Sequence, residues 1–490
     1  MSRLRLSLAA LLLAGTAASA QQTDLTIALQ LEPPHLDPTS AAAGAIDSVL
    51  YSNVFEGLTR FAEDGSVQPG LAERWEISGE GTLYTFHLRP GVTFHDGSAM
   101  DAEDVKFTLD RARADDSQNA QKALFAGIAE VRVVDPQTVE VQLAAPDGGF
   151  LFNMAWGDAV IVAPESIEGI KQAPVGTGPF RFDAWVQGDR IELVRNPDYW
   201  GTAPALERAT FRFISDPTAA FSAMMAQDID AFAGFPAPEN LPMFDADPRF
   251  QVLVGSTEGE TILAMNNREA PFTDPRVREA VAHAIDRQAI IDGAMFGLGT
   301  PIGTHFAPHN PDYTDLTSLS AHDPERARAL LAEAGLADGF STTLKLPPPS
   351  YARRGGEIVA AQLRAVGIET EITTLEWAQW LEEVFRAGDF GLTVISHTEP
   401  MDINIYARPD YYFGYDSAEF RALIDELTAT TDPAARSDLL RRAQERIAQD
   451  YVNAYLFQLA FPTVADARLR GLWTNMPTQA TDLTQVRWTE

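Results

Sequence analysis

A short polar segment, Ser396-His-Thr-Glu-Pro-Met-Asp402, carries the residues of this chain that are best placed to do chemistry. Glu399 and Asp402 could form a carboxylate pair, and His397 is a further polar candidate beside them. The preceding run, Phe390–Ile395, is apolar and predicts a buried strand. In open α/β sheets, ligands bind beyond the carboxyl ends of the strands. The segment therefore predicts one wall of a ligand-binding cleft.

Paired acids could also belong to a secreted hydrolase, which is a second interpretation. The chain has no G-x-S-x-G nucleophile motif and no H-E-x-x-H metal motif. It contains no cysteine, which excludes a cysteine nucleophile, thiolate metal sites and disulfides. We therefore expect a protein that is not an enzyme. Turnover of a captured peptide or oligosaccharide by the pure protein would favour the hydrolase instead.

The histidines do not follow a familiar metal-binding pattern. His87, His95 and Asp96 lie close in sequence, but their spacing fits no standard zinc site. His305 and His309 lack a nearby second pair of ligands and are predicted to be ordinary loop residues. We expect no metal site and no cofactor.

Several aromatic residues could pack either on a ligand or in a core. Trp377 and Trp380 are three residues apart, which places them on one face of a predicted helix over 377–387. Trp156 ends a second predicted helix, Phe150–Trp156, and has the same two interpretations.

Helices and strands alternate between residues 323 and 395. Gly335, Gly367 and Gly388 each follow a predicted helix, the position that glycine prefers at a helix C-terminus. Such βαβ alternation predicts a parallel sheet with helices on its faces. This region should therefore position the polar segment that follows it.

The ends and the charge of the chain indicate where it works. Residues 1–20 have Arg3 and Arg5, an apolar run and an Ala18-Ser-Ala20 site, which together predict a signal peptide cleaved after Ala20. Loss of the two arginines takes the formal charge from −32 to −34. Nucleic acids and anionic membranes attract clustered positive charge, so this acidity argues against both as partners.

A glycine-rich turn followed by a hairpin is the most specific motif. Pro174–Gly201 reads PVGTGPFRFDAWVQGDRIELVRNPDYWG, with Gly176 and Gly178 in a sharp turn and two predicted strands after it. This string resembles a signature of the family 5 solute-binding proteins of ABC importers, the peptide-binding class. Three further blocks are similar to the same family in the same order: Asn53–Leu58, Gln68–Ala112 and Pro271–Arg287.

The resemblance implies an α/β, two-lobed periplasmic binding protein fold of the class II kind, with an extra subdomain in the first lobe. The expected division is a signal peptide at 1–20, lobe I at 21–56, 170–262 and 460–490, its subdomain at 57–169, and lobe II at 263–459. It implies a monomer in the periplasm that captures dipeptides or oligopeptides by hinge closure and delivers them to an inner-membrane ABC permease. The expected ligand-binding residues are Glu32, Trp156, Thr177, Gly178, Trp377, Trp380, His397, Glu399, Asp402 and Tyr412.

The position that selects the ligand's charge departs from the family pattern. Peptide-binding relatives commonly have an acid three residues before a D/E-P step, where it pairs with the α-amino group of the peptide. Here the step is Glu399-Pro400, and the matching residue is Ser396. Either Glu399 or Asp402 takes over the amine, or the ligand has no free amine there. An opine, an oligosaccharide or a metal chelate therefore remains an alternative ligand.

Overall fold

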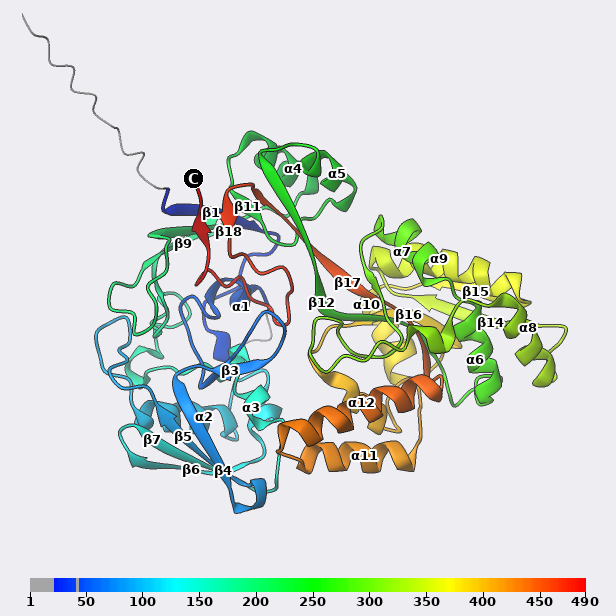
Figure 1. Cartoon of the computed structure of the whole chain (residues 1–490), viewed down its shortest axis with the longest axis horizontal. Helices are drawn as coiled ribbons and strands as arrows, with labels where there is room; N and C mark the ends of the chain where they lie inside the picture. The colour runs from blue at the N-terminus through cyan, green and yellow to red at the C-terminus, as the bar shows by residue number, and fades with distance from the viewer. Residues whose placement is uncertain (1–21, 41–43) are drawn as a thin grey trace, which may run out of the picture.

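The computed structural model describes residues 22–40 and 44–490 of the chain, so the predicted signal peptide lies outside the described residues. An eleven-stranded sheet runs through both halves of the molecule (Figure 1). Its strands are β1 Asp24–Leu29, β8 Phe180–Val186, β9 Arg190–Arg195, β10 Arg208–Phe213, β11 Ala231–Phe232, β12 Phe250–Met265, β13 Thr300–Pro301, β14 Phe340–Leu346, β15 Ile368–Thr374, β16 Leu392–His397 and β17 Asn453–Asp466. Their order is β15-β14-β16-β12-β17-β11-β1-β10-β9-β8, with β13 paired to β17 beside this path.

The first lobe contains the chain's N-terminal strand. β1 pairs in parallel with β10 and β11, and the predicted hairpin of β8 and β9 closes this end of the sheet. Gly188 forms the hairpin turn with a φ of 78°, a conformation that glycine adopts without strain. The helices of this lobe are α1 Gly44–Leu50, α4 Pro217–Ala226 and α5 Leu241–Asp245.

A separate four-stranded antiparallel sheet forms a subdomain beside the first lobe (Figure 1). Its strands run in the order β4 Ala72–Ser78, β5 Leu83–Leu88, β7 Thr138–Leu143 and β6 Ile128–Asp135. Helix α2, Ala102–Arg113, begins at Asp101, whose side chain accepts from Glu103 N–H while Asp104 bonds back to the Asp101 N–H. Helix α3 spans Phe150–Asn153, so the predicted helix to Trp156 is too long.

The second lobe has the predicted βαβ arrangement. β14 pairs in parallel with β15 and β16, and Gly335, Gly367 and Gly388 have φ values of 82°, 97° and 65° where helices end. β16 begins and ends two residues later than predicted, because Ser396 and His397 still pair with Thr261 and Glu260 of β12. The helices are α6 Pro275–Ala284, α7 Arg287–Met295, α8 Pro324–Glu333, α9 Ser350–Ala365, α10 Trp377–Trp380 with a π-helical turn at Leu381–Arg386, α11 Ala418–Ala429 and α12 Pro433–Gln449.

The long strands β12 and β17 connect the two lobes. They are antiparallel over most of their length, from Phe250↔Asp466 to Ala264↔Asn453. The register shifts between the pairs Ser256↔Ala460 and Glu260↔Gln458, because four residue steps along β12 correspond to only two along β17. This bulge bends the ladder at the point where it passes from one lobe to the other. The sheet is continuous through this point, so the lobe boundaries given above stay predictions.

The remaining strands are short: β2 Thr59–Phe61, β3 Val67–Pro69, β18 Leu469–Arg470 and β19 Arg487–Trp488. Within residues 22–40 and 44–490, no helix has the length and apolar character needed to cross a bilayer.

Candidate functional site

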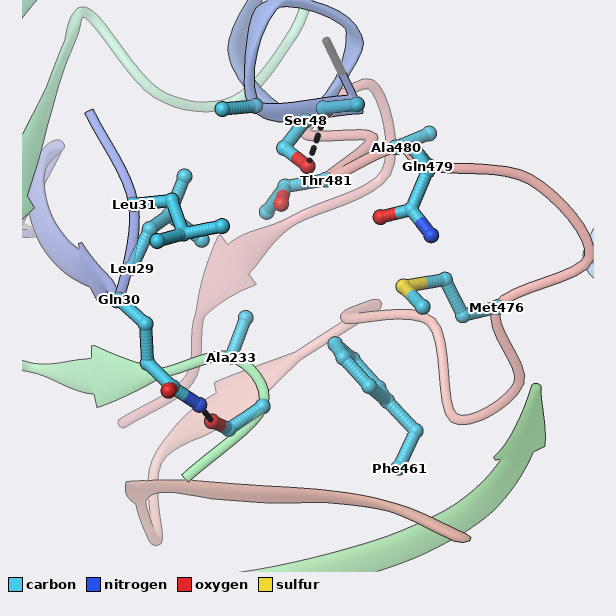
Figure 2. A pocket seen from close by; sticks show the side chains of 13 residues that line it. Leu29, Gln30, Leu31, Ser48, Ala233, Phe461, Met476, Gln479, Ala480 and Thr481 are labelled. Carbon is cyan, nitrogen blue, oxygen red and sulfur yellow. Dashed lines mark hydrogen bonds between the residues drawn. The ribbon is translucent and has the colours of Figure 1, made fainter. Parts of the chain in front are cut away.

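Three adjoining cavities follow the junction between the lobes. The first has a volume of about 390 Å³ and lies in lobe I, where Leu31, Ala233 and Phe461 form apolar walls (Figure 2). It shares Gly44, Met476 and Gln479 with a middle cavity of about 350 Å³. The middle cavity shares Trp156 and Pro400 with a third cavity of about 430 Å³. These volumes are within the range of small-ligand sites.

The middle cavity is lined by acids from both lobes. Asp47 and Asp158 come from lobe I, Glu258 comes from the bulge of β12, and Glu399 comes from the loop after β16. None of the described residues that line it is lysine or arginine. Its wall therefore favours a ligand that carries positive charge.

Two of these acids are held in an unfavourable environment. Asp158 is 6% exposed, and the Oδ1 atoms of Asp47 and Asp158 have no hydrogen-bond partner among the described residues. Burial, together with the charge of Asp37, raises the pKa of Asp158 to about 7. Burial and the nearby Asp158 raise the pKa of Asp47 well above its usual range. Both oxygens remain available to a ligand donor.

The bulge of β12 also carries a hydrogen-bonded chain of side chains. His309 lies between Ser256 and Glu258, with Nδ1 2.7 Å from Ser256 Oγ and Nε2 2.7 Å from Glu258 Oε1. Burial raises the pKa of Glu258, and the contact with His309 opposes that shift. His309 does lie in a loop, as predicted, but the loop folds back and its imidazole is hydrogen-bonded to the bulge.

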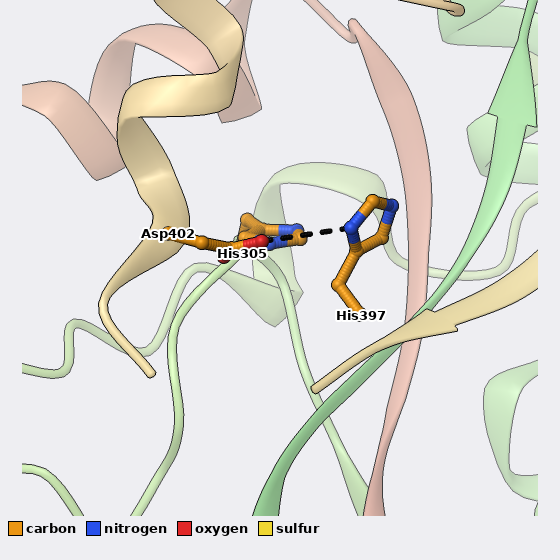
Figure 3. A group of neighbouring side chains, drawn as sticks. All are labelled: His305, His397 and Asp402. Atoms are coloured by element: carbon orange, nitrogen blue, oxygen red, sulfur yellow. Dashed lines mark hydrogen bonds and ion pairs between the residues drawn. The ribbon is translucent and has the colours of Figure 1, made fainter. Parts of the chain in front are cut away.

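His397, Asp402 and Tyr412, three of the predicted site residues, come together with His305. Figure 3 shows the two histidines and Asp402. Asp402 Oδ1 lies 2.7 Å from His305 Nε2, and Oδ2 lies 3.5 Å from His397 Nδ1. Burial would raise the pKa of Asp402, but the two histidines outweigh it and hold that pKa below its usual range. His305 lies in a loop, as predicted, but it is only 1% exposed.

Glu260 extends this buried polar group from the neighbouring strand. It is the register partner of His397 on β12 and is 3% exposed, and its Oε2 has no partner among the described residues. Burial, followed by the charges of Glu258 and Asp402, raises its pKa well above the usual range.

The three predicted tryptophans have different surroundings. Trp156 lines the middle and third cavities, and its Nε1–H has no partner among the described residues. Trp380 is 4% exposed and donates from Nε1 to Thr393 Oγ1 at 3.0 Å, so it is a core residue in this conformation. Trp377 packs edge-on against Trp380 and is 44% exposed.

Glu32, Thr177 and Gly178 contact the protein's own chain and do not line these three cavities. Glu32 accepts from Trp185 Nε1 and from the Gly188 N–H in the β8–β9 hairpin. Thr177 donates to Glu56, which also accepts from Tyr199 and Trp200. A Cβ on Gly178 would lie 2.4 Å from Asn53 O, so this turn requires glycine to pack on the 53–56 segment.

The third cavity contains a cation and a contact between the lobes. Arg436 of α12 and Asp147 both line it, and Arg436 donates to Leu427 O and Thr430 O. Next to Asp147, the Gly148 N–H donates to Thr428 O of α11 at 2.7 Å. The subdomain of lobe I thus touches lobe II directly beside the cavity.

Comparison with known proteins identifies the family. Residues 66–431 match the model of the bacterial extracellular solute-binding proteins, family 5. The chain belongs to this family. It is 33% identical over 372 residues to the glutathione-binding protein GsiB of Salmonella paratyphi A, covering 74% of this chain and 72% of that protein. It is 28% identical over 491 residues to the dipeptide-binding protein of Escherichia coli K12, covering 91% and 90%.

The fold of this family is also the fold found here. The structure of HbpA2 from Haemophilus parasuis superposes with a TM-score of 0.86 at 25% identity, covering 95% of this chain and 100% of that one. The predicted family and the two-lobed α/β fold are therefore confirmed, and the family is one of binding proteins.

Sequence reasoning missed four residues that line the cavities, Asp47, Asp158, Glu258 and Arg436. It also missed two buried residues next to Asp402 and His397, namely His305 and Glu260. One signal was present, since Glu258 and Glu260 directly precede the apolar run Ile262–Met265 within the same strand. The others lie in segments far apart in sequence, and nothing local distinguishes them from surface residues.

Proposed function

We propose that this chain is the periplasmic peptide receptor of an ABC importer. It is exported, cleaved after Ala20, and acts as a monomer without catalytic activity. It captures a short peptide by closure of its lobes and delivers the peptide to the inner-membrane permease. The relatives named for glutathione and for dipeptides support a peptide ligand. The acid-lined cavity between the lobes carries the proposal, because a peptide's ammonium group complements it.

The distribution of charge suggests how the peptide is oriented. Its ammonium group enters the middle cavity, where Glu399 is exposed and forms no ion pair within the described chain; only its Oε2 accepts a hydrogen bond, from the Thr398 N–H at 3.3 Å. Asp402 is the weaker candidate because His305 and His397 already occupy its two oxygens. The free Nε1–H of Trp156 donates to a peptide carbonyl between the cavities. Arg436 in the third cavity then faces the carboxylate end.

The test is Glu399→Gln, with affinity for dialanine and glutathione measured by calorimetry. Removing one charge-assisted hydrogen bond costs about 1.5–3 kcal/mol. We therefore expect binding to weaken by roughly 10- to 100-fold. N-acetylated dialanine, which has no ammonium group, should bind the wild type as weakly as dialanine binds the variant.

Glu382→Gln is the matched control, because Glu382 is exposed on the π-helical turn and pairs with Arg386. It should leave affinity unchanged. Equal affinity of wild type and Glu399→Gln for dialanine would reject Glu399 as the amine site. A wild type that binds no free-amine peptide would instead favour an opine, an oligosaccharide or a chelate as the ligand.

A further inference from the structure

The buried group around Asp402 has the composition of a metal site. His305 Nε2, His397 Nδ1 and a carboxylate oxygen of Asp402 all lie within 4.8 Å of one another (Figure 3). Two imidazoles and one carboxylate form a donor set that suits divalent late transition metals such as Zn²⁺. Ligand atoms about 2.1 Å from a tetrahedral ion lie roughly 3.4 Å apart. The His397–Asp402 separation of 3.5 Å already matches that spacing, whereas His305 Nε2 and Asp402 Oδ1, which are hydrogen-bonded at 2.7 Å, must separate slightly to admit the ion.

The outer nitrogens of both histidines are fixed by buried tyrosines. His305 Nδ1 lies 3.2 Å from Tyr406 Oη, and His397 Nε2 lies 3.1 Å from Tyr412 Oη. The rings are held as well, since His397 stacks on Tyr412 at an interplanar angle of 10°. A metal-binding histidine almost always makes a hydrogen bond with its second ring nitrogen, and this bond orients the first nitrogen toward the ion.

Three largely buried carboxyl groups lie in this region, and none of them is paired with a lysine or arginine of the described chain. Within the described part of the chain, Asp402, Glu258 and Glu260 form no ion pair with lysine or arginine, and the charged contacts of Asp402 and Glu258 are to histidines. Glu260 Oε2 is buried without a hydrogen-bond partner, although Glu260 is the cross-strand partner of His397. Directly opposed residues in an antiparallel pair have neighbouring side chains on one face. A buried carboxylate oxygen without a partner is costly, and a cation would compensate it.

We propose that His305, His397 and Asp402 bind a divalent transition-metal ion. Asp402 also lines the third cavity, which gives the ion a path from solvent. The ion joins the loop after β13, the end of β16 and the turn Asp402–Ala407. It therefore stabilises the face of lobe II that borders the cleft. The proposal rests on these side chains and does not depend on the ligand being a peptide.

The experiment uses the mature protein without a polyhistidine tag, stripped with a chelator. Binding of ZnCl₂ is measured by calorimetry, and CoCl₂ is added to record the visible spectrum. We expect one equivalent of Zn²⁺ to bind with micromolar or tighter affinity and to raise the melting temperature. Co²⁺ should give the absorption of a low-symmetry site with nitrogen and oxygen ligands. Failure of the wild type to bind either metal below millimolar concentration overturns the proposal without any variant.

His397→Gln and His305→Gln should each weaken Zn²⁺ binding by at least about 100-fold, and Tyr412→Phe by about 10-fold. His322→Gln is the matched control, because His322 is half-exposed and lies outside the cluster. Circular dichroism and the melting temperature without metal show whether each variant is folded. A folded His397→Gln protein that binds Zn²⁺ as the wild type does would place the ion elsewhere and reject this site.

Discussion

At the scale of single residues, the cleft shows that one side-chain type behaves differently in different environments. Asp402 is buried between two imidazoles, and they keep its pKa low. Asp158 is buried beside Asp37 and Asp47 without such partners, and its pKa rises to about 7. Desolvation acts on both carboxylates in the same direction, so the neighbouring charges decide the outcome.

Asp158→Asn should therefore stabilise the ligand-free protein at neutral and alkaline pH. The folded-state pKa of about 7 lies above the unfolded value near 3.8, so the folded protein binds the extra proton between these values. Stability is highest below the unfolded pKa and is lost as pH rises through the folded pKa. We expect the variant to gain on the order of 1–3 kcal/mol at pH 8 and little at pH 4, as measured by urea unfolding.

Asp116→Asn is the control for this experiment, because Asp116 is exposed on a turn. Its stability should follow that of the wild type at both pH values. If Asp158→Asn raised the free energy of unfolding equally at pH 4 and pH 8, packing and not charge would be the cause of the stabilisation.

At the scale of elements, two features govern how the lobes meet. The bulge in β12 bends the ladder that joins them and presents Glu258 to the cavity. On the far side of the cavities, the loop at Gly148 bonds to the end of α11. A Cβ at Gly148 would lie 1.8 Å from Thr430 O and 2.1 Å from an Arg436 nitrogen, so only glycine allows this approach.

Gly148→Ala should separate the lobes at this contact while each lobe stays folded. We expect a larger radius of gyration in solution scattering and weaker binding of dialanine, since closure becomes more costly. Gly127→Ala is the matched control in the same subdomain, because no heavy atom lies within 4 Å of the added Cβ. Unchanged scattering and affinity for Gly148→Ala would mean that this contact plays no part in closure.

At the scale of the whole molecule, the arrangement is two lobes joined by two antiparallel strands (Figure 1). A two-stranded link resists bending less than a fully packed interface, and hinge closure around a ligand is the expected motion. The acids that line the middle cavity come from both lobes. A cation bound between them contacts the acids of both lobes only when the lobes are close together, and it then offsets the repulsion between these acids.

Saturating peptide should therefore compact the protein. We expect the radius of gyration from small-angle scattering to fall on addition of dialanine, and not on addition of its N-acetylated form at the same concentration. Compaction by both compounds would assign closure to contacts other than the ammonium group. No compaction by a peptide that calorimetry shows to be bound would contradict capture by hinge motion.

Local patterns in the sequence were enough to predict much of the fold. The β8–β9 hairpin and the glycines after the helices of lobe II depend on a few neighbouring residues, so sequence alone determined them. The signature at 174–201 also identified the family. Only the structure shows how this segment is held together. Thr177, Tyr199 and Trp200 all donate hydrogen bonds to the buried carboxylate of Glu56.

The cleft was decided by tertiary structure. Asp47, Asp158, Glu258 and Glu399 come from four distant segments and meet only when the lobes assemble. His305 reads as a loop residue until the chain buries it between Asp402 and Tyr406. A residue's charge state and its role as a ligand depend on burial and on neighbours within a few ångströms. Those distances are set by the packing of remote segments, so sequence determined the elements and the family, whereas the three-dimensional structure determined which side chains form the site.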